Sequence, residues 1–199
     1  MIKVGLNSRW RTICGFGALL FVCFVSMLWA RFSGQWLVVD RPERADVIVV
    51  LAADSTDLSY YRGLELLRSG YGKVMFVDAS TRRRFGEAGT EASERFIRAT
   101  AGESSERIRV CPLAAGGEAE SVHVCVAPLR PRRLLLVTSD FYSRRALSLF
   151  QNRLPQYNWS IAVAPNNQRF GVHWWRERAW AATYVREWQE MIWWFVVDR

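Results

Sequence analysis

The stretch ADVIVVLAA, at positions 45–53, decides the fold, because every residue in it from Val47 onward is apolar. Its centre is rich in β-branched side chains, which favour an extended backbone. A strand with one face in water alternates apolar and polar residues, whereas a parallel strand covered by helices on both faces has a continuous apolar run. The stretch therefore predicts a central parallel strand in an α/β domain.

Strand-like and helix-like patterns alternate through the rest of the chain, as a parallel sheet requires. Further strand-like runs occur at residues 73–79, 107–112, 132–139 and 159–165. Helical periodicity is found at residues 58–70, 89–102, 118–129 and 143–154, and one long helix is expected at 173–197. The pattern predicts a Rossmann-like three-layer domain with a mostly parallel sheet of about five strands.

Ahead of this domain, Ile13 to Ala30 form an uncharged run of 18 residues, which is the short end of the length that crosses a bilayer. Trp10, Trp29 and Trp36 lie near its two ends and suit a membrane–water interface. A cleaved signal peptide is the alternative, but MLWARFSG fits the small-residue pattern of a cleavage site poorly. We therefore expect residues 1–36 to form an N-terminal stub and a transmembrane anchor, and residues 37–199 to form the α/β domain.

The chain has a formal net charge of +8, and 25 of its 27 basic residues are arginines. Guanidinium groups bind carboxylates and phosphates, so the partners that the basic composition allows are anionic ligands, anionic lipid and nucleic acid. The basic residues are scattered and the chain is anchored, so we expect no nucleic acid partner. Those that flank the anchor are Lys3, Arg9 and Arg11 before it and Arg31, Arg41 and Arg44 after it. Because the number of basic residues on the two sides is equal, the charge rule does not decide the orientation in the membrane.

Of the four cysteines, Cys14 and Cys23 lie in the apolar anchor. Cys111 and Cys125 can pair if the domain faces an oxidising compartment. The alternative, which we favour from the sequence, is that both are separate small buried side chains. No CxxC motif is present, and the chain has only two histidines, so we expect no metal site.

Ligands of an open α/β sheet bind beyond the carboxyl ends of the strands, where the connecting loops share one rim. Polar residues follow three predicted strands, at Asp54 and Ser55, at residues 78–84 and at residues 138–145. Arg62, Glu91 and Glu120 lie near the starts of predicted helices. This mixture of carboxylates, hydroxyls and arginines suits a polar ligand, either phosphorylated or sugar-like.

Each of these candidates also has a purely structural role open to it. Ser139 and Asp140 suit the cap of a helix that begins near Phe141. Glu91 and Glu120 suit the positive end of a helix dipole, and residues 82–84 suit a solvated loop.

No catalytic arrangement stands out. Ser139 is not part of a G-x-S-x-G turn, and no glycine-rich phosphate loop follows a strand. His123 lies within an apolar helical run and suits the core, whereas His173 precedes two tryptophans and is the better functional candidate. The sequence leaves open whether the protein is an enzyme and which cofactor it would use.

Several segments together resemble the SanA/YdcF/ElyC-like family of bacterial envelope proteins. They are ADVIVVLAA, YYRGLELLRSGYGKVMFVDAS, TEASERFI, GGEAESV, LLLVTSDFYSRRALSLF and HWWRERAW, and they cover Ala45 to Trp188. The family's pattern Ser-x-x-His-x-x-Arg-Ala matches VTSDFYSRRA at Ser139, Tyr142, Arg145 and Ala146. Further matches are Asp46, Arg62, Glu91, Glu120 and Glu187. The resemblance implies a ligand site formed by Arg62, Glu91, Glu120, Ser139, Tyr142 and Arg145.

The chain departs from the family pattern at its most specific positions. Tyr142 replaces the histidine, Gly117 replaces a threonine, and Ala52-Ala53-Asp54 replaces glycines. Because the pKa of tyrosine is near 10, Tyr142 cannot readily act as a base at neutral pH. The resemblance implies an inner-membrane protein with its domain on the periplasmic side and a role in envelope or peptidoglycan-related metabolism. One branch of the family is associated with S-adenosylmethionine.

A second hypothesis follows from the same departures and from the aromatic C-terminus. Six tryptophans stand near the end of the chain: Trp174, Trp175, Trp180, Trp188, Trp193 and Trp194. Such an aromatic surface can pack on the sheet, contact lipid, or bind a membrane-protein partner. The chain would then be a catalytically degenerate accessory subunit of a membrane complex.

Overall fold

The computed structural model describes residues 8–51, 57–79, 89–112, 117–164 and 170–197. Its centre is a five-stranded, all-parallel sheet with the strand order β3-β2-β1-β4-β5. The strands are β1 (Val47–Val50), β2 (Val74–Ala79), β3 (Ile108–Pro112), β4 (Arg133–Thr138) and β5 (Asn158–Val163). This is the Rossmann-like sheet that the alternation of patterns predicts.

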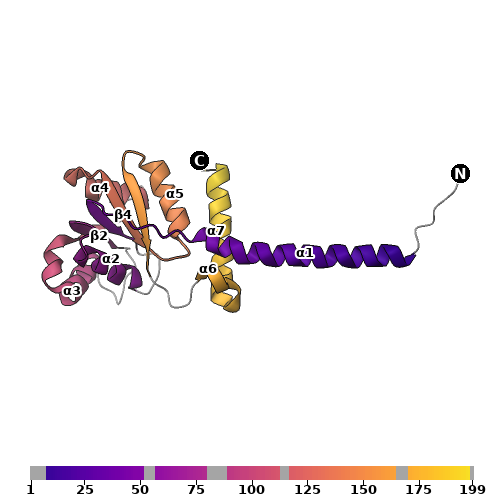
Figure 1. The fold of residues 1–199 in the computed structure, drawn as a ribbon. Coiled ribbons are helices and arrows are strands. Elements are labelled where there is room, and N and C mark those ends of the chain that lie inside the picture. Colours follow the sequence, from indigo (N-terminus) through magenta and orange to yellow (C-terminus); the bar gives the residue numbers. More distant parts are fainter. Residues whose placement is uncertain (1–7, 52–56, 80–88, 113–116, 165–169, 198–199) are drawn as a thin grey trace.

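Helices cover both faces of the sheet (Figure 1). One face carries α2 (Leu58–Arg68) and α3 (Gly89–Ala101), which is followed by the short 3-10 helix η1 (Gly102–Arg107). The other carries α4 (Glu118–Val126), with its 3-10 extension η2 (Ala127–Leu129), and α5 (Ser143–Arg153). In β1, Ile48 and Val50 pack toward the first pair of helices, and Val47 and Val49 pack toward the second. Both faces of the strand are buried, which is why its sequence has no polar alternation.

Asp46 fixes the start of β1 against β4. Its Oδ2 accepts hydrogen bonds from the backbone N–H groups of Arg132 and Arg133 at 2.9 and 3.0 Å. These two bonds lower the pKa of the Asp46 carboxyl below its ordinary value. Asp46 precedes its strand and therefore lies at the amino ends of the strands, away from the rim where ligands bind in this fold.

The N-terminal helix α1 (Ser8–Leu37) projects from the domain as one long rod (Figure 1). Residues Ile13–Leu37 are long and apolar enough to cross a membrane, and none of the apolar window is buried against the protein. The helix is compatible with a single membrane span or a signal sequence. Its last two turns differ from the rest, because Ser33, Gly34 and Leu37 are buried against the domain.

The expectation of a single long C-terminal helix at 173–197 is wrong, because the helix is interrupted near Glu177. The segment forms α6 (Phe170–His173), a 3-10 turn η3 (Trp174–Arg176) and α7 (Arg178–Val197). Trp174 stacks on Tyr184 with ring centroids 3.7 Å apart. In a continuous helix these two residues would stand about 15 Å apart along the axis. Glu177 is extended, with φ −121° and ψ 133°, and lets the chain fold back so that the rings meet.

Candidate functional site

The switch point of the sheet lies between β1 and β4, where successive crossovers change direction. The described residues at this point are Thr138, Ser139 and Asp140 at the end of β4, together with the first turns of α4 and α5. Asp54, Ser55 and residues 80–84, which were also predicted for the rim, lie outside the described residues. The geometry of the site therefore comes from β4, α4 and α5.

A hydrogen-bonded pair, the buried Tyr142 and the half-buried Glu118, occupies the centre of this region. The Tyr142 hydroxyl donates a 2.6 Å hydrogen bond to Glu118 Oε2, and so joins the turn before α5 to the start of α4. Burial raises the pKa of the Glu118 carboxyl, and the Tyr142 hydrogen bond and the Arg145 charge offset only part of this effect. Burial and the adjacent Glu118 also raise the pKa of Tyr142 above its ordinary value. Tyr142 is thus a hydrogen-bond donor at neutral pH and not a base.

Arg145 is bound on its other side by Glu187 of α7. Its Nε donates to Glu187 Oε2 at 2.9 Å and its Nη2 donates to Oε1 at 3.2 Å. The exposed fractions of the two side chains are 26% for Arg145 and 6% for Glu187. Burial acts to lower the pKa of Arg145, but the Glu187 hydrogen bond and charge outweigh it and raise that pKa. The guanidinium also lies over the Tyr142 ring, 4.4 Å from its centroid, and Arg145 therefore links α5 to α7.

The turn after β4 is buried and polar. Thr138 is fully buried, and its Oγ1 has no hydrogen-bond partner within the described ranges. Ser139 and Asp140 are also buried, and Asp140 Oδ1 accepts a 2.8 Å hydrogen bond from Phe141 N. The helix begins at Ser143, and its N-cap residue, Tyr142, makes no side-chain capping hydrogen bond. Asp140 therefore fixes the turn itself instead of capping a helix that begins at Phe141.

The structure does not gather all six predicted ligand residues. Arg62 lies on α2, on the face of the sheet opposite to Tyr142 and Arg145, and its Nη1 donates to Glu65 at 2.7 Å. Glu91 is in the first turn of α3, and its side chain lies outside the described part of the molecule. Ser139, Tyr142 and Arg145 do lie together, because one turn carries them. Glu120 is exposed in the first turn of α4.

Beside the Tyr142–Glu118 pair lies an open groove with a volume of about 430 Å³. It is lined by residues 117–120 at the start of α4 and by Leu149, Arg153 and Leu154 at the end of α5. Two carboxylates, Glu118 and Glu120, and one guanidinium provide its polar groups, and the leucines provide its apolar wall. Such a groove suits a polar molecule with hydroxyl groups and an apolar edge.

Sequence reasoning missed Glu118 and undervalued Glu187. Glu118 stands two positions before the predicted Glu120, and it is the more buried of the two. A buried tyrosine hydroxyl at this turn requires a hydrogen-bond acceptor, and that requirement could have pointed to a nearby carboxylate such as Glu118. Glu187 matched the family pattern, but only the packing of α7 shows that its partner is Arg145.

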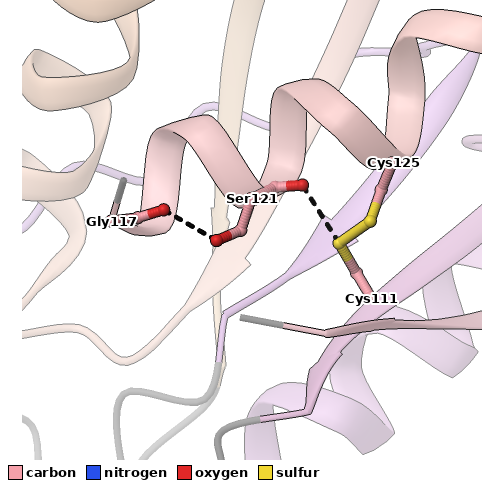
Figure 2. The surroundings of a disulfide bond; sticks show 4 residues. All are labelled: Cys111, Gly117, Ser121 and Cys125. Carbon is pink, nitrogen blue, oxygen red and sulfur yellow. Dashed lines mark hydrogen bonds between the residues drawn. A yellow bond between two sulfur atoms is a disulfide. The ribbon is translucent and has the colours of Figure 1, made fainter. Parts of the chain in front are cut away.

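A disulfide joins Cys111, at the end of β3, to Cys125 on α4, with the Cα atoms 6.0 Å apart (Figure 2). This overturns the expectation of two separate buried thiols, because the crossover from β3 to α4 brings the two residues to one place. Gly117 starts α4 with φ 99°, a conformation that strains residues with a side chain. The glycine that replaces the family's threonine therefore has a structural reason, while Ser121 Oγ bonds the Gly117 carbonyl at 2.7 Å.

Metal binding finds no support in the described parts of the chain, where no three His, Cys, Asp or Glu side chains form a group that could hold an ion. His123 is half-buried, and its Nδ1 lies 3.0 Å from the hydroxyl of Tyr157. His173 is in α6 and contacts the ring of Trp175, away from the groove.

Comparison of the chain with protein-family models, with curated proteins and with solved structures gave no match. The site is therefore described by its own geometry: a buried acid–phenol pair beside a polar groove, and an arginine committed to an ion pair. This arrangement can hold a proton between Glu118 and Tyr142 and can present carboxylates to a ligand.

Proposed function

We propose that the chain is a single-pass, membrane-anchored protein of the bacterial envelope whose α/β domain binds a polar, hydroxyl-rich small molecule in the groove beside Glu118. The observation that carries the proposal is the half-buried Glu118 carboxyl, which lines the groove between the start of α4 and the end of α5 and accepts a hydrogen bond from Tyr142. Carboxylates that accept hydrogen bonds from vicinal hydroxyl groups fit a sugar-like ligand. The family resemblance points to the same chemistry, that of cell-wall metabolism.

The charges favour hydroxyl groups over a phosphate in this groove. An anion at the start of α4 would meet the helix dipole, but also Glu118 and Glu120 in the first turn. Arg145, the guanidinium expected to hold an anion, is already paired with Glu187. Among the described groove residues, Arg153 is the one cation that faces the two carboxylates.

The site also lies close to the anchor. Ser143 begins α5, and its Oγ accepts a 2.8 Å hydrogen bond from Val39 N, two residues after α1 ends. The same Oγ lies 3.3 Å from the carbonyl oxygen of Leu37. The turn that carries Ser139 and Tyr142 is therefore near the membrane end of the domain, where a ligand attached to or released from the bilayer would arrive.

The proposed location is the periplasmic face of the inner membrane. The Cys111–Cys125 disulfide supports this side, because such bonds persist in oxidising compartments and are rare in the cytosol. Flanking charges alone leave the two orientations nearly tied.

Ligand binding can be tested on the full chain in mild detergent by thermal shift and calorimetry. The probes are N-acetylglucosamine, N-acetylmuramic acid, inorganic phosphate, a nucleotide and S-adenosylmethionine. Saturable binding of an amino sugar is expected, and Leu149→Trp, which fills the groove, is expected to abolish it. Glu106→Ala, an exposed change on η1, is the matched control. Binding of phosphate alone, or no binding by any probe, would contradict the proposal.

A second candidate function is an accessory subunit with a site that no longer turns over substrate. The specific observation in its favour is that Glu118, Tyr142, Arg145 and Glu187 satisfy one another. Purification from native membranes in mild detergent tests this candidate. A defined complex that survives Leu149→Trp would support it, and a lone protomer at native abundance would count against it.

A further inference from the structure

The end of α1 is bound into the C-terminal part of the chain. Ser33 Oγ lies 2.6 Å from the hydroxyl of Tyr184 on α7, and Trp174 Nε1 donates a 2.9 Å hydrogen bond to the carbonyl of Ala30. At Gly34 a Cβ atom would stand 2.4 Å from Trp174 Cδ1, so the rings approach the α1 backbone as closely as glycine permits. The C-terminal end of α1 is therefore held against α7 and against the turn that carries Trp174.

Tryptophan rings mark where α7 meets α1. Trp188 of α7 stacks on Trp36 with centroids 5.2 Å apart and contacts Trp29 at 5.8 Å. Trp29 and Trp36 are two turns apart on α1, so α7 meets the helix along that short interval. Figure 1 shows α7 running across the domain end of α1 and not along it.

This crossing point coincides with the end of the bare part of the anchor. From Ile13 to Trp29 every side chain is exposed, and the first buried residue is Ser33. At 1.5 Å per residue, Ile13 to Ala30 spans about 27 Å, close to the thickness of a bilayer's hydrocarbon core. If α1 spans the membrane, α7 crosses it at the level of the lipid headgroups.

The side of α7 that faces away from the domain is exposed and mostly apolar, with Gln189 as a polar residue among its apolar side chains. Val185, Ile192 and Val196 recur at helical spacing and are 51%, 56% and 77% exposed, and Trp193 beside them is 62% exposed. Glu187 and Met191, which are buried against the domain, lie on the other side of the helix. Within the described chain nothing covers the apolar stripe.

Positive charge accompanies this apolar stripe. Arg178 and Arg186 are exposed on α7, and Arg31 is exposed on α1 next to the crossing. The Arg144 guanidinium lies over the Trp36 ring, 4.0 Å from its centroid, and its Nε donates to the Trp36 carbonyl. Apolar and tryptophan side chains bordered by arginines are typical of helices that lie in a membrane interface.

We propose that α7 lies flat in the lipid headgroup region on the domain side of the membrane, with Val185, Ile192, Trp193 and Val196 facing the acyl chains. The occupant of this surface is lipid, because the anchor already fixes the depth and tilt of α7. The domain is then held by two elements, one through the bilayer and one along its surface. This inference rests on the proposed membrane span of α1.

The test uses the full chain reconstituted into vesicles of phosphatidylethanolamine and phosphatidylglycerol. A spin label is placed on Val196→Cys or Ile192→Cys, with Cys14 and Cys23 replaced by alanine. The matched aqueous control is Val124→Cys on α4, which is 60% exposed. In a Cys14→Ala chain, native Cys23 serves as the probe of the span itself. Each label is read by its collision with oxygen, which partitions into lipid, and with a water-soluble nickel complex.

We expect the ratio of oxygen to nickel accessibility at positions 192 and 196 to exceed that at position 124 several-fold, and to lie below that at Cys23. A lipid-embedded Cys23 with water-exposed labels at 192 and 196 would overturn the interfacial helix while leaving the anchor intact. Labels shielded from both reagents at 192 and 196 would also overturn it, in favour of a protein partner. A water-exposed Cys23 would overturn the anchor and the inference together.

Discussion

Replacing Glu187 with glutamine tests whether Arg145 is a structural residue or a ligand-binding one. The exchange keeps the shape of the side chain but removes the charge that holds Arg145 in two hydrogen bonds. Breaking a buried ion pair by removing one partner costs about 3–5 kcal/mol. Because Arg145 retains 26% exposure, water can solvate part of its charge, and about 2–3 kcal/mol is the better expectation here.

The loss should appear as a lower melting temperature of the full chain in mild detergent. For a domain of this size 1 kcal/mol corresponds to about 2–4 °C, so Glu187→Gln should melt about 5–10 °C lower than the natural chain. Glu190→Gln is the matched control, since Glu190 is exposed and stands one turn further along α7. It should leave the melting temperature almost unchanged.

A double variant separates the ion pair from other effects of the substitution. When Arg145→Met is combined with Glu187→Gln, the double variant should lose less stability than the sum of the two single losses, because each single variant already removes the same interaction. Full additivity, or a melting temperature for Glu187→Gln equal to that of Glu190→Gln, would refute the structural role. Tighter binding of phosphate by Glu187→Gln at unchanged stability would instead identify Arg145 as a ligand residue.

Three further outcomes are expected. Reduction of the Cys111–Cys125 disulfide, or replacement of both cysteines by serine, should lower the free energy of unfolding by about 3 kcal/mol, measured by chemical denaturation with and without reductant; equal stability would contradict the bond. Asp46 has a lowered pKa in the folded chain, so its contribution is present above the ordinary Asp pKa and is lost as pH falls through the folded pKa. Melting curves of Asp46→Ala and the natural chain should therefore differ most at neutral pH and converge in acid. Glu118 has a raised pKa, so the natural chain should lose stability as pH rises from the ordinary Glu pKa to the folded one. Glu118→Gln should lack this loss, and parallel melting profiles would contradict the shift.

Sequence patterns predicted the sheet well because its central strands β1 and β4 are buried on both faces. The runs at positions 45–53 and 132–139 carry that burial directly in their composition, and the parallel order of the sheet then follows from right-handed crossovers. The apolar helix α1 was equally visible, since its uncharged run of 18 residues is long enough to be distinguished from a core segment. These features depend on local composition, which a sequence displays.

The site was predicted only in part, because it depends on which side chains meet across elements. Ser139, Tyr142 and Arg145 were found together since one turn carries them. A crossover determines which face of the sheet carries Arg62, and nothing in its own helix indicates that Arg145 lies on the other face. The break at Glu177 likewise follows from ring stacking that no local pattern specifies.

The position of α7 connects the site to the N-terminal helix α1. Glu187 on its inner side binds Arg145, which lies over Tyr142, which in turn holds Glu118 at the groove. Trp188, on the next position of the same helix, contacts both Trp29 and Trp36 of the anchor. A shift of α7 relative to α5 would therefore have to move or break the Arg145 ion pair. Tyr142, where the chain departs from the resembled pattern, is thus part of a network that links the groove to α1, which gives this tyrosine a structural role although it cannot act as a base.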